Sequence, residues 1–147
     1  MPFDSDSFDL ITSLGVMHHI PNVSYVMNEC YRCLRHSGIM LLREPIVSMG
    51  DWRKPRPGLT KRERGIPLSI LDSIILSLGF KINRRSFCIF PPLLTIANKL
   101  GIAAYNSSAI TLADALLSQA FSWNIKYHRT HWRDRFVPMS VYYVLEK

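Results

Sequence analysis

The stretch that decides the fold is PFDSDSFDLITSLGVMHHIP, residues 2–21. Within it, residues 8–13 form a short apolar run, bounded by Asp and Ser before it and by Gly15 after it, which predicts a β-strand. Gly15 lets the backbone approach a neighbour or a ligand closely at the end of that strand. The stretch has the character of the middle of a domain, since a buried strand and its turn come almost at once.

An amphipathic helix follows the turn. Its apolar side chains fall on one stripe at helical spacing, while polar side chains lie largely off that stripe; the apolar set is Val23, Val26, Met27, Cys30 and Leu34. Pro21 suits the start of this helix, and Gly38 suits its stop. Residues 39–42 are then continuously apolar, which is typical of a strand covered on both faces.

The rest of the chain continues to alternate. Residues 46–66 are rich in Pro, Gly and basic side chains and predict a long loop. Beyond that loop we expect a helix over residues 70–78, ended by Gly79, a strand over 80–90 with a bulge near 84–86, helices over 93–100 and 109–121, and a closing strand over 139–145. This order predicts an α/β fold with a largely parallel sheet and helices on both faces.

Composition limits the class of protein. With 147 residues the chain fits one domain and can bury a real core. We find no apolar run long enough to span a bilayer and no signal-peptide pattern, so a reducing cytoplasm is the expected location. The 3 cysteines are an odd number without a scaffold-like spacing, which argues against a disulfide framework.

The net charge of +7 is concentrated in two groups. The first lies in the loop and consists of Arg53, Lys54, Arg56, Lys61, Arg62 and Arg64; the second consists of Lys126, Arg129, Arg133 and Arg135. Each group is a potential anion site or an ordinary solvated surface. Aromatic residues near them are typical of nucleic-acid binders. No nucleic-acid motif accompanies them, so nucleic acid is not the expected partner.

The opening stretch resembles the second half of a class I S-adenosylmethionine-dependent methyltransferase of the type 11 kind. That family has a similar acidic entry to its fourth strand, a histidine-containing turn, a helix with Glu-x-x-Arg-x-Leu and a Gly-led fifth strand. This chain has Glu29-x-x-Arg32-x-Leu34, followed by a strand candidate from Gly38 to Pro45. The resemblance is specific up to about Pro45 and architectural beyond it, and it implies a partial Rossmann-like sheet with an antiparallel closing strand.

The resemblance also implies site residues. Ligands of open α/β sheets bind beyond the carboxyl ends of the strands. By the family pattern, Leu14, Gly15 and Val16 would line S-adenosylmethionine.

By the same pattern, His18 or His19 would act as general base for the methyl acceptor. The alternative is that one histidine caps the following helix and the other packs under the cofactor. For the substrate or an anion we name Glu44, Arg53, Lys54 and Arg56.

Two sets of residues have spacings that resemble metal-ligand motifs, but each gives only weak support for a metal site. Cys30-x-x-Cys33 could join His18 and His19, but Cys30 lies on the apolar stripe and no second ligand pair follows at zinc-finger spacing. His128-x-x-His131 with Asp134 lies in a basic stretch that disfavours a cation. We therefore predict no metal site.

The family's Gly-rich cofactor loop has no counterpart in these residues. We expect a single truncated domain, 1–147, with basic loop 46–66 and helical insertion 91–137, that does not methylate by itself. The strand at residues 8–13 would be an apolar sheet edge, open to an amino-terminal half or to a second copy.

Two alternatives to a methyltransferase fragment stay open. One is a binding or regulatory module that pairs with an intact methyltransferase. The other is a basic-loop binder of nucleic acid or anionic lipid. A small-molecule, sugar or lipid-linked methyl acceptor is the expected substrate class, because the insertion is apolar and aromatic.

Overall fold

The computed structural model describes residues 1–50, 55–56, 58–59 and 63–147. Its strands are β1 (Phe8–Leu14), β2 (Leu34–Pro45), β3 (Lys81–Cys88) and β4 (Ser140–Glu146). Its α-helices are α1 (Val23–Cys33), α2 (Leu68–Ser77), α3 (Pro91–Lys99) and α4 (Ser108–Ala120), and four 3-10 helices join them: η1 (Met17–His19), η2 (Ala104–Asn106), η3 (Ser122–Asn124) and η4 (Trp132–Arg135). The predicted alternation of strands and helices is confirmed.

The sheet has the order β1-β2-β4-β3. β1 pairs with β2 in parallel, and β4 runs antiparallel to both of its neighbours, β2 and β3. Three strands therefore share one direction and the closing strand is reversed, as the sequence predicted. In the described part of the chain β1 has a partner on one side only, which confirms that it is an edge strand.

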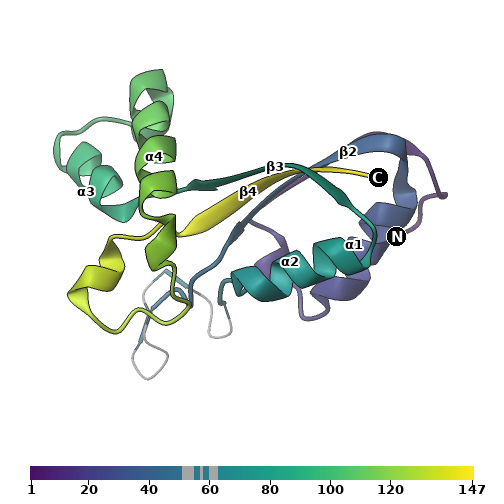
Figure 1. Ribbon diagram of the computed structural model, residues 1–147, viewed down its shortest axis with the longest axis horizontal. Helices are drawn as coiled ribbons and strands as arrows, with labels where there is room; N and C mark the ends of the chain where they lie inside the picture. The colour runs from purple at the N-terminus through teal and green to yellow at the C-terminus, as the bar shows by residue number, and fades with distance from the viewer. Residues whose placement is uncertain (51–54, 57, 60–62) are drawn as a thin grey trace.

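The helices divide between one face and one end of the sheet. Figure 1 shows α1 and α2 side by side beneath the strands, whereas α3 and α4 gather at the end where β3 finishes and β4 begins. Both chain termini lie at the other end. The helical insertion thus sits beside the carboxyl ends of β1, β2 and β3, where α/β sheets bind ligands.

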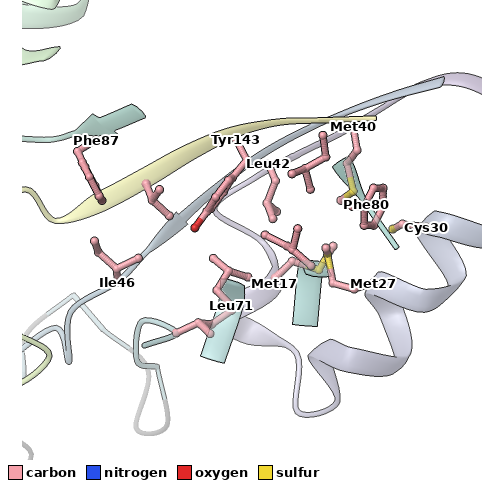
Figure 2. Close-up of a cluster of buried hydrophobic side chains, with 14 of the residues drawn as sticks. Met17, Met27, Cys30, Met40, Leu42, Ile46, Leu71, Phe80, Phe87 and Tyr143 are labelled. Atoms are coloured by element: carbon pink, nitrogen blue, oxygen red, sulfur yellow. The ribbon is translucent and has the colours of Figure 1, made fainter. Parts of the chain in front are cut away.

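The hydrophobic core lies between the sheet and the α1–α2 layer (Figure 2). Met27 and Cys30 of α1 and Leu71 of α2 face Met40 and Leu42 of β2. On β2 the buried side chains alternate with less buried ones, so this strand has one core face. The continuous apolar run at residues 39–42 indicated a strand covered on both faces, and that prediction is wrong for the described residues, since Ile39 and Leu41 remain partly exposed.

The boundary between α1 and β2 also differs from the prediction. Helix α1 ends at Cys33, and Leu34 is already extended, so Gly38 lies inside β2 and does not stop the helix. Two partners hold this segment in the sheet: Phe8 of β1 opposite Leu34, and the main chain of Lys147, which bonds to both Ser37 and Gly38. The bulge in β3 is found between Ile82 and Arg84, slightly before the predicted place.

Glu29 and Arg32 link helix α1 to the chain segment that precedes β1. Arg32 pairs with Glu29 at 2.9 Å and also donates to the main-chain oxygen of Phe3 at 3.0 Å. The hydrogen bonds from Arg32 lower the pKa of Glu29 to about 2. Asp134 has a similarly lowered pKa, about 2, because the main-chain N–H of His131 and the ammonium of Lys126 bond to it.

These lowered pKa values predict acid sensitivity. A carboxylate with a depressed folded-state pKa stabilises the fold above its unfolded-state pKa, and this contribution is lost as pH falls through the folded value. Thermal melts should therefore show a midpoint that declines between about pH 5 and about pH 2. Glu29→Gln should weaken that decline, and Asp9→Asn, whose side chain is 81% exposed, is the control. An identical decline in Glu29→Gln and the wild type would contradict this assignment.

Candidate functional site

A turn centred on Gly15 follows β1 and is hydrogen-bonded to the carboxyl end of β2. Its main-chain N–H donates to the oxygen of Arg43 at 2.7 Å, and its φ of +77° lies in the left-handed region that favours glycine. A Cβ atom at this position would lie 3.3 Å from Arg43 Nη2 and 3.9 Å from His18 Cε1. Gly15 therefore lets Arg43 and His18 flank the turn closely.

Glu44 holds the turn from below. Its carboxylate is fully buried and accepts the main-chain N–H groups of Val16 and Met17, both at 2.9 Å, and of His18 at 3.2 Å. A fourth contact of 2.9 Å joins it to His18 Nδ1. Since a carboxylate only accepts, Nδ1 carries the hydrogen of this bond. Glu44 thus fixes both the backbone of η1 and the ring of His18.

The two histidines have different surroundings. The His18 side chain is 7% exposed, and its Nε2 lies 3.8 Å from Glu63 Oε1, beyond hydrogen-bond distance. His19 is exposed, and its ring lies tilted by 39° against that of His18 with the centroids 4.0 Å apart. Neither histidine caps helix α1, because the side chain of Asn22 accepts from Tyr25 N and fills that position. The helix-capping alternative is therefore wrong.

Leu14 and Val16 present apolar surface on either side of Gly15. Their exposed fractions are 51% and 49%, which are high for large apolar residues at a sheet end. All three residues predicted to line the cofactor therefore lie together at the carboxyl edge of the sheet, next to His18. This surface suits the apolar and ring portions of a ligand, with Gly15 giving backbone access.

The residues predicted for the substrate or an anion do not form one group. Glu44 is buried under the turn, where its carboxylate accepts from four N–H donors and so positions the turn. Arg56 donates to the main-chain oxygens of Met49 and Glu63. Arg53 and Lys54 lie outside the described residues.

Arg43, next to Glu44 at the end of β2, was not among the predicted site residues. Its side chain extends to the face of the sheet away from α1 and α2, where it lines a cavity of about 510 Å³. Tyr142 of β4, Cys88 at the end of β3, and Tyr105 and Asp114 of the helical insertion line the same cavity. Asp114 accepts the main-chain N–H groups of Ile89 and Phe90 and so joins α4 to the end of β3.

Candidate metal ligands are arranged differently from the sequence patterns. Cys30 and Cys33 are buried in the core side of α1, and burial raises the pKa of the Cys30 thiol to about 11. Among the described residues, one donor group has suitable spacing: His18, His19 and Glu63, with ligand atoms within 4.8 Å of one another. Arg43 flanks the same turn, and its positive charge opposes a cation there.

The sheet order places the fold among known structures. Solved structures of S-adenosylmethionine-dependent methyltransferases share the fold of this chain, a mixed sheet with one reversed closing strand. A family model described as a methyltransferase domain matches residues 1–42, which confirms the type 11 resemblance predicted from the sequence. No curated protein matches the chain.

Three solved structures illustrate the fold. An S-adenosylmethionine-dependent methyltransferase from Mesorhizobium loti aligns with all of this chain at 15% identity and a TM-score of 0.59. A candidate methyltransferase from Bacillus halodurans C-125 aligns with all of it at 16% identity and a TM-score of 0.56. The cyclase SpnF also aligns with all of it, at 14% identity and a TM-score of 0.56.

These similarities establish the fold and leave the reaction open, since one of the three proteins is named for a cyclisation. This chain covers 65%, 73% and 53% of their respective lengths. In the described part of the chain, no helix is both long and apolar enough to cross a membrane.

Proposed function

We propose that this chain supplies the carboxyl half of an S-adenosylmethionine-dependent methyltransferase site. The observation that carries the proposal is the turn from Leu14 to His18, held by the buried carboxylate of Glu44 at the carboxyl edge of a methyltransferase-type sheet. Leu14, Gly15 and Val16 would line the cofactor, because Leu14 and Val16 offer exposed apolar surface and the positive φ of Gly15 suits a residue without a side chain. When bound, S-adenosylmethionine supplies an electrophilic methyl group on a sulfonium.

His18 is the residue we assign to proton transfer. Glu44 accepts from Nδ1, so in the neutral ring Nε2 is the free acceptor and can take the proton of an O–H or N–H acceptor as its methyl bond forms. The ring is held in one orientation by the carboxylate, and this preorganisation favours a positioned base. His19 is more exposed and has no such partner among the described residues, so we assign it no proton-transfer role.

The cavity beside Arg43 supports a small-molecule acceptor. Its volume of about 510 Å³ is in the range of small-ligand sites, and phenol, guanidinium and aliphatic groups line it. Arg43 Nη2 is close to Gly15, so this cavity opens next to the proposed cofactor surface. A sugar or the head of a lipid-linked acceptor is compatible with the same lining.

The proposal includes a partner for the open edge. Strand β1 has one neighbour in the described chain, and Leu10 and Leu14 on its outer face are 54% and 51% exposed. Such an apolar edge is a template for further strands. We propose that a half-domain carrying the Gly-rich loop pairs there, and that methyl transfer requires it.

Calorimetric titration with S-adenosylhomocysteine tests whether cofactor binding requires the second half-domain. A complete site with micromolar affinity has about 8 kcal/mol of binding free energy, and loss of several hydrogen bonds worth about 1–3 kcal/mol each leaves millimolar affinity. We therefore expect a dissociation constant of about 1 mM or weaker for this chain alone. Size-exclusion chromatography of the same sample would show whether β1 also pairs two copies. Micromolar binding would contradict the need for another half-domain.

A further inference from the structure

The fold places two arginines of the second basic group, Arg129 and Arg135, in one cavity. A hollow of about 420 Å³ lies between the segment after β2 and the end of the helical insertion. The first side contributes Ser48 and Gly50, and the second contributes Arg129, Thr130, Trp132 and Arg135. Residues almost ninety positions apart in the sequence thus face the same space, which lies beyond β2 and shares none of the residues of the Gly15 turn.

The two arginines make this cavity strongly cationic. Within the described part of the chain, neither Arg129 nor Arg135 has a hydrogen bond or an ion pair, although Arg129 is half-buried. Burial and the neighbouring charge of Arg135 lower the pKa of Arg129. Two guanidinium groups held close together without a bound carboxylate repel each other, and a shared anion would relieve that repulsion.

The carboxylate nearest to this pair is already satisfied. Asp134 is buried and accepts from Lys126 Nζ at 3.1 Å and from the main-chain N–H groups of Thr130 and His131 at 3.0 Å. It attracts Arg129 at longer range but makes no ion pair with it. Asp134 therefore holds the loop that carries the arginines and does not neutralise them through an ion pair.

One residue of the first basic group, Arg56, packs against Gly50, which lines the cavity. A Cβ atom on Gly50, whose φ is +110°, would lie 3.2 Å from Arg56 Cδ. The Arg56 guanidinium donates to the main-chain oxygen of Glu63 at 2.6 Å. Arg56 therefore supports this wall as part of the loop structure and does not itself line the cavity.

We propose that this cavity binds the phosphate groups of a small organic phosphate, such as a nucleotide or another phosphate ester, with Arg129 and Arg135 as its anion ligands. Paired guanidinium forks match phosphate oxygens in geometry as well as charge. The volume exceeds that of a phosphate ion and leaves room for an organic part. Trp132, which is 67% exposed at the rim, offers a ring on which that part can stack. The inference does not depend on methyl transfer and would stand if the cofactor titration failed.

The test is a calorimetric titration of the 147-residue chain with ADP, inorganic pyrophosphate and adenosine. We expect ADP and pyrophosphate to bind and adenosine not to bind. Arg129→Gln and Arg135→Gln should each weaken ADP binding about 10-fold to 100-fold. Arg129→Lys, which keeps the charge and loses the fork, should have a smaller effect.

Lys99→Gln is the control, because Lys99 is an exposed basic residue of α3 that does not line the cavity. It should leave ADP binding nearly unchanged, and thermal melts should show that all the variants are folded. No binding of ADP or pyrophosphate at about 5 mM would overturn the proposal. An equal loss in Lys99→Gln, or binding of a single-stranded oligonucleotide that the three glutamine variants weaken alike, would also overturn it in favour of general charge attraction.

Discussion

Glu44→Ala should destabilise the protein by about 3 kcal/mol or more. The substitution removes a fully buried carboxylate and leaves the N–H groups of Val16, Met17 and His18, with His18 Nδ1, without their acceptor. Urea denaturation followed by circular dichroism would measure the free energy of unfolding. Glu44→Gln keeps the shape and one acceptor oxygen, so its loss should be smaller.

Glu63→Gln is the matched control for that result. Glu63 faces the same histidine from the outside, with Oε1 at 3.8 Å from Nε2, and its side chain does not hold the backbone of η1. We expect this variant to lower the free energy of unfolding by less than Glu44→Ala does, because the main-chain N–H groups of Met17 and His18 bond to Glu44. If Glu44→Ala proved as stable as Glu63→Gln, Glu44 would not be the residue that organises the turn.

Leu71→Ala should cost about 2–5 kcal/mol, the usual range for removing a buried leucine side chain. Leu71 is fully buried in α2 and packs in the cluster that joins α2 to β2 and α1 (Figure 2). The adjacent Ile70→Ala is the control, because Ile70 is 52% exposed on the same helix and should change stability little. Equal effects of the two substitutions would show that the α2 layer does not cover the sheet as described.

Most of the fold was predictable because local patterns and tertiary packing agree. The apolar run at residues 8–13, the helical stripe of α1 and the glycine stop after α2 each specify an element that forms. The start of β2 was not predictable, because residues 34–38 join the sheet only through their pairing with Phe8 and Lys147, which are distant in sequence. Local helix signals cannot report such long-range partners.

The position of the candidate site was predictable from the sequence, but its hydrogen bonds and the residues that meet in its cavities were not. Leu14 to His18 were found from the glycine turn and the family resemblance. A signal for Glu44 was present, since it follows Met40 and Leu42 on the core face of β2, where a buried carboxylate must find donors. The meeting of Gly50 with Arg129 and Arg135 depends on the path of two long loops, and no sequence spacing indicates it.

The central claim is that the Gly15 turn is a cofactor surface, and an amide NMR titration with S-adenosylhomocysteine tests it most directly. We predict chemical-shift changes concentrated at residues 14–19 and Arg43, even if affinity is only about 1 mM. Gly15→Ala should weaken them, because alanine disfavours positive φ and its Cβ would lie 3.3 Å from Arg43 Nη2, so that side chain must shift. Gly101→Ala carries the same backbone strain, at φ +68°, with nothing within 4 Å, and should leave them intact. Shifts absent from residues 14–19, or equally present in Gly15→Ala, would contradict the account.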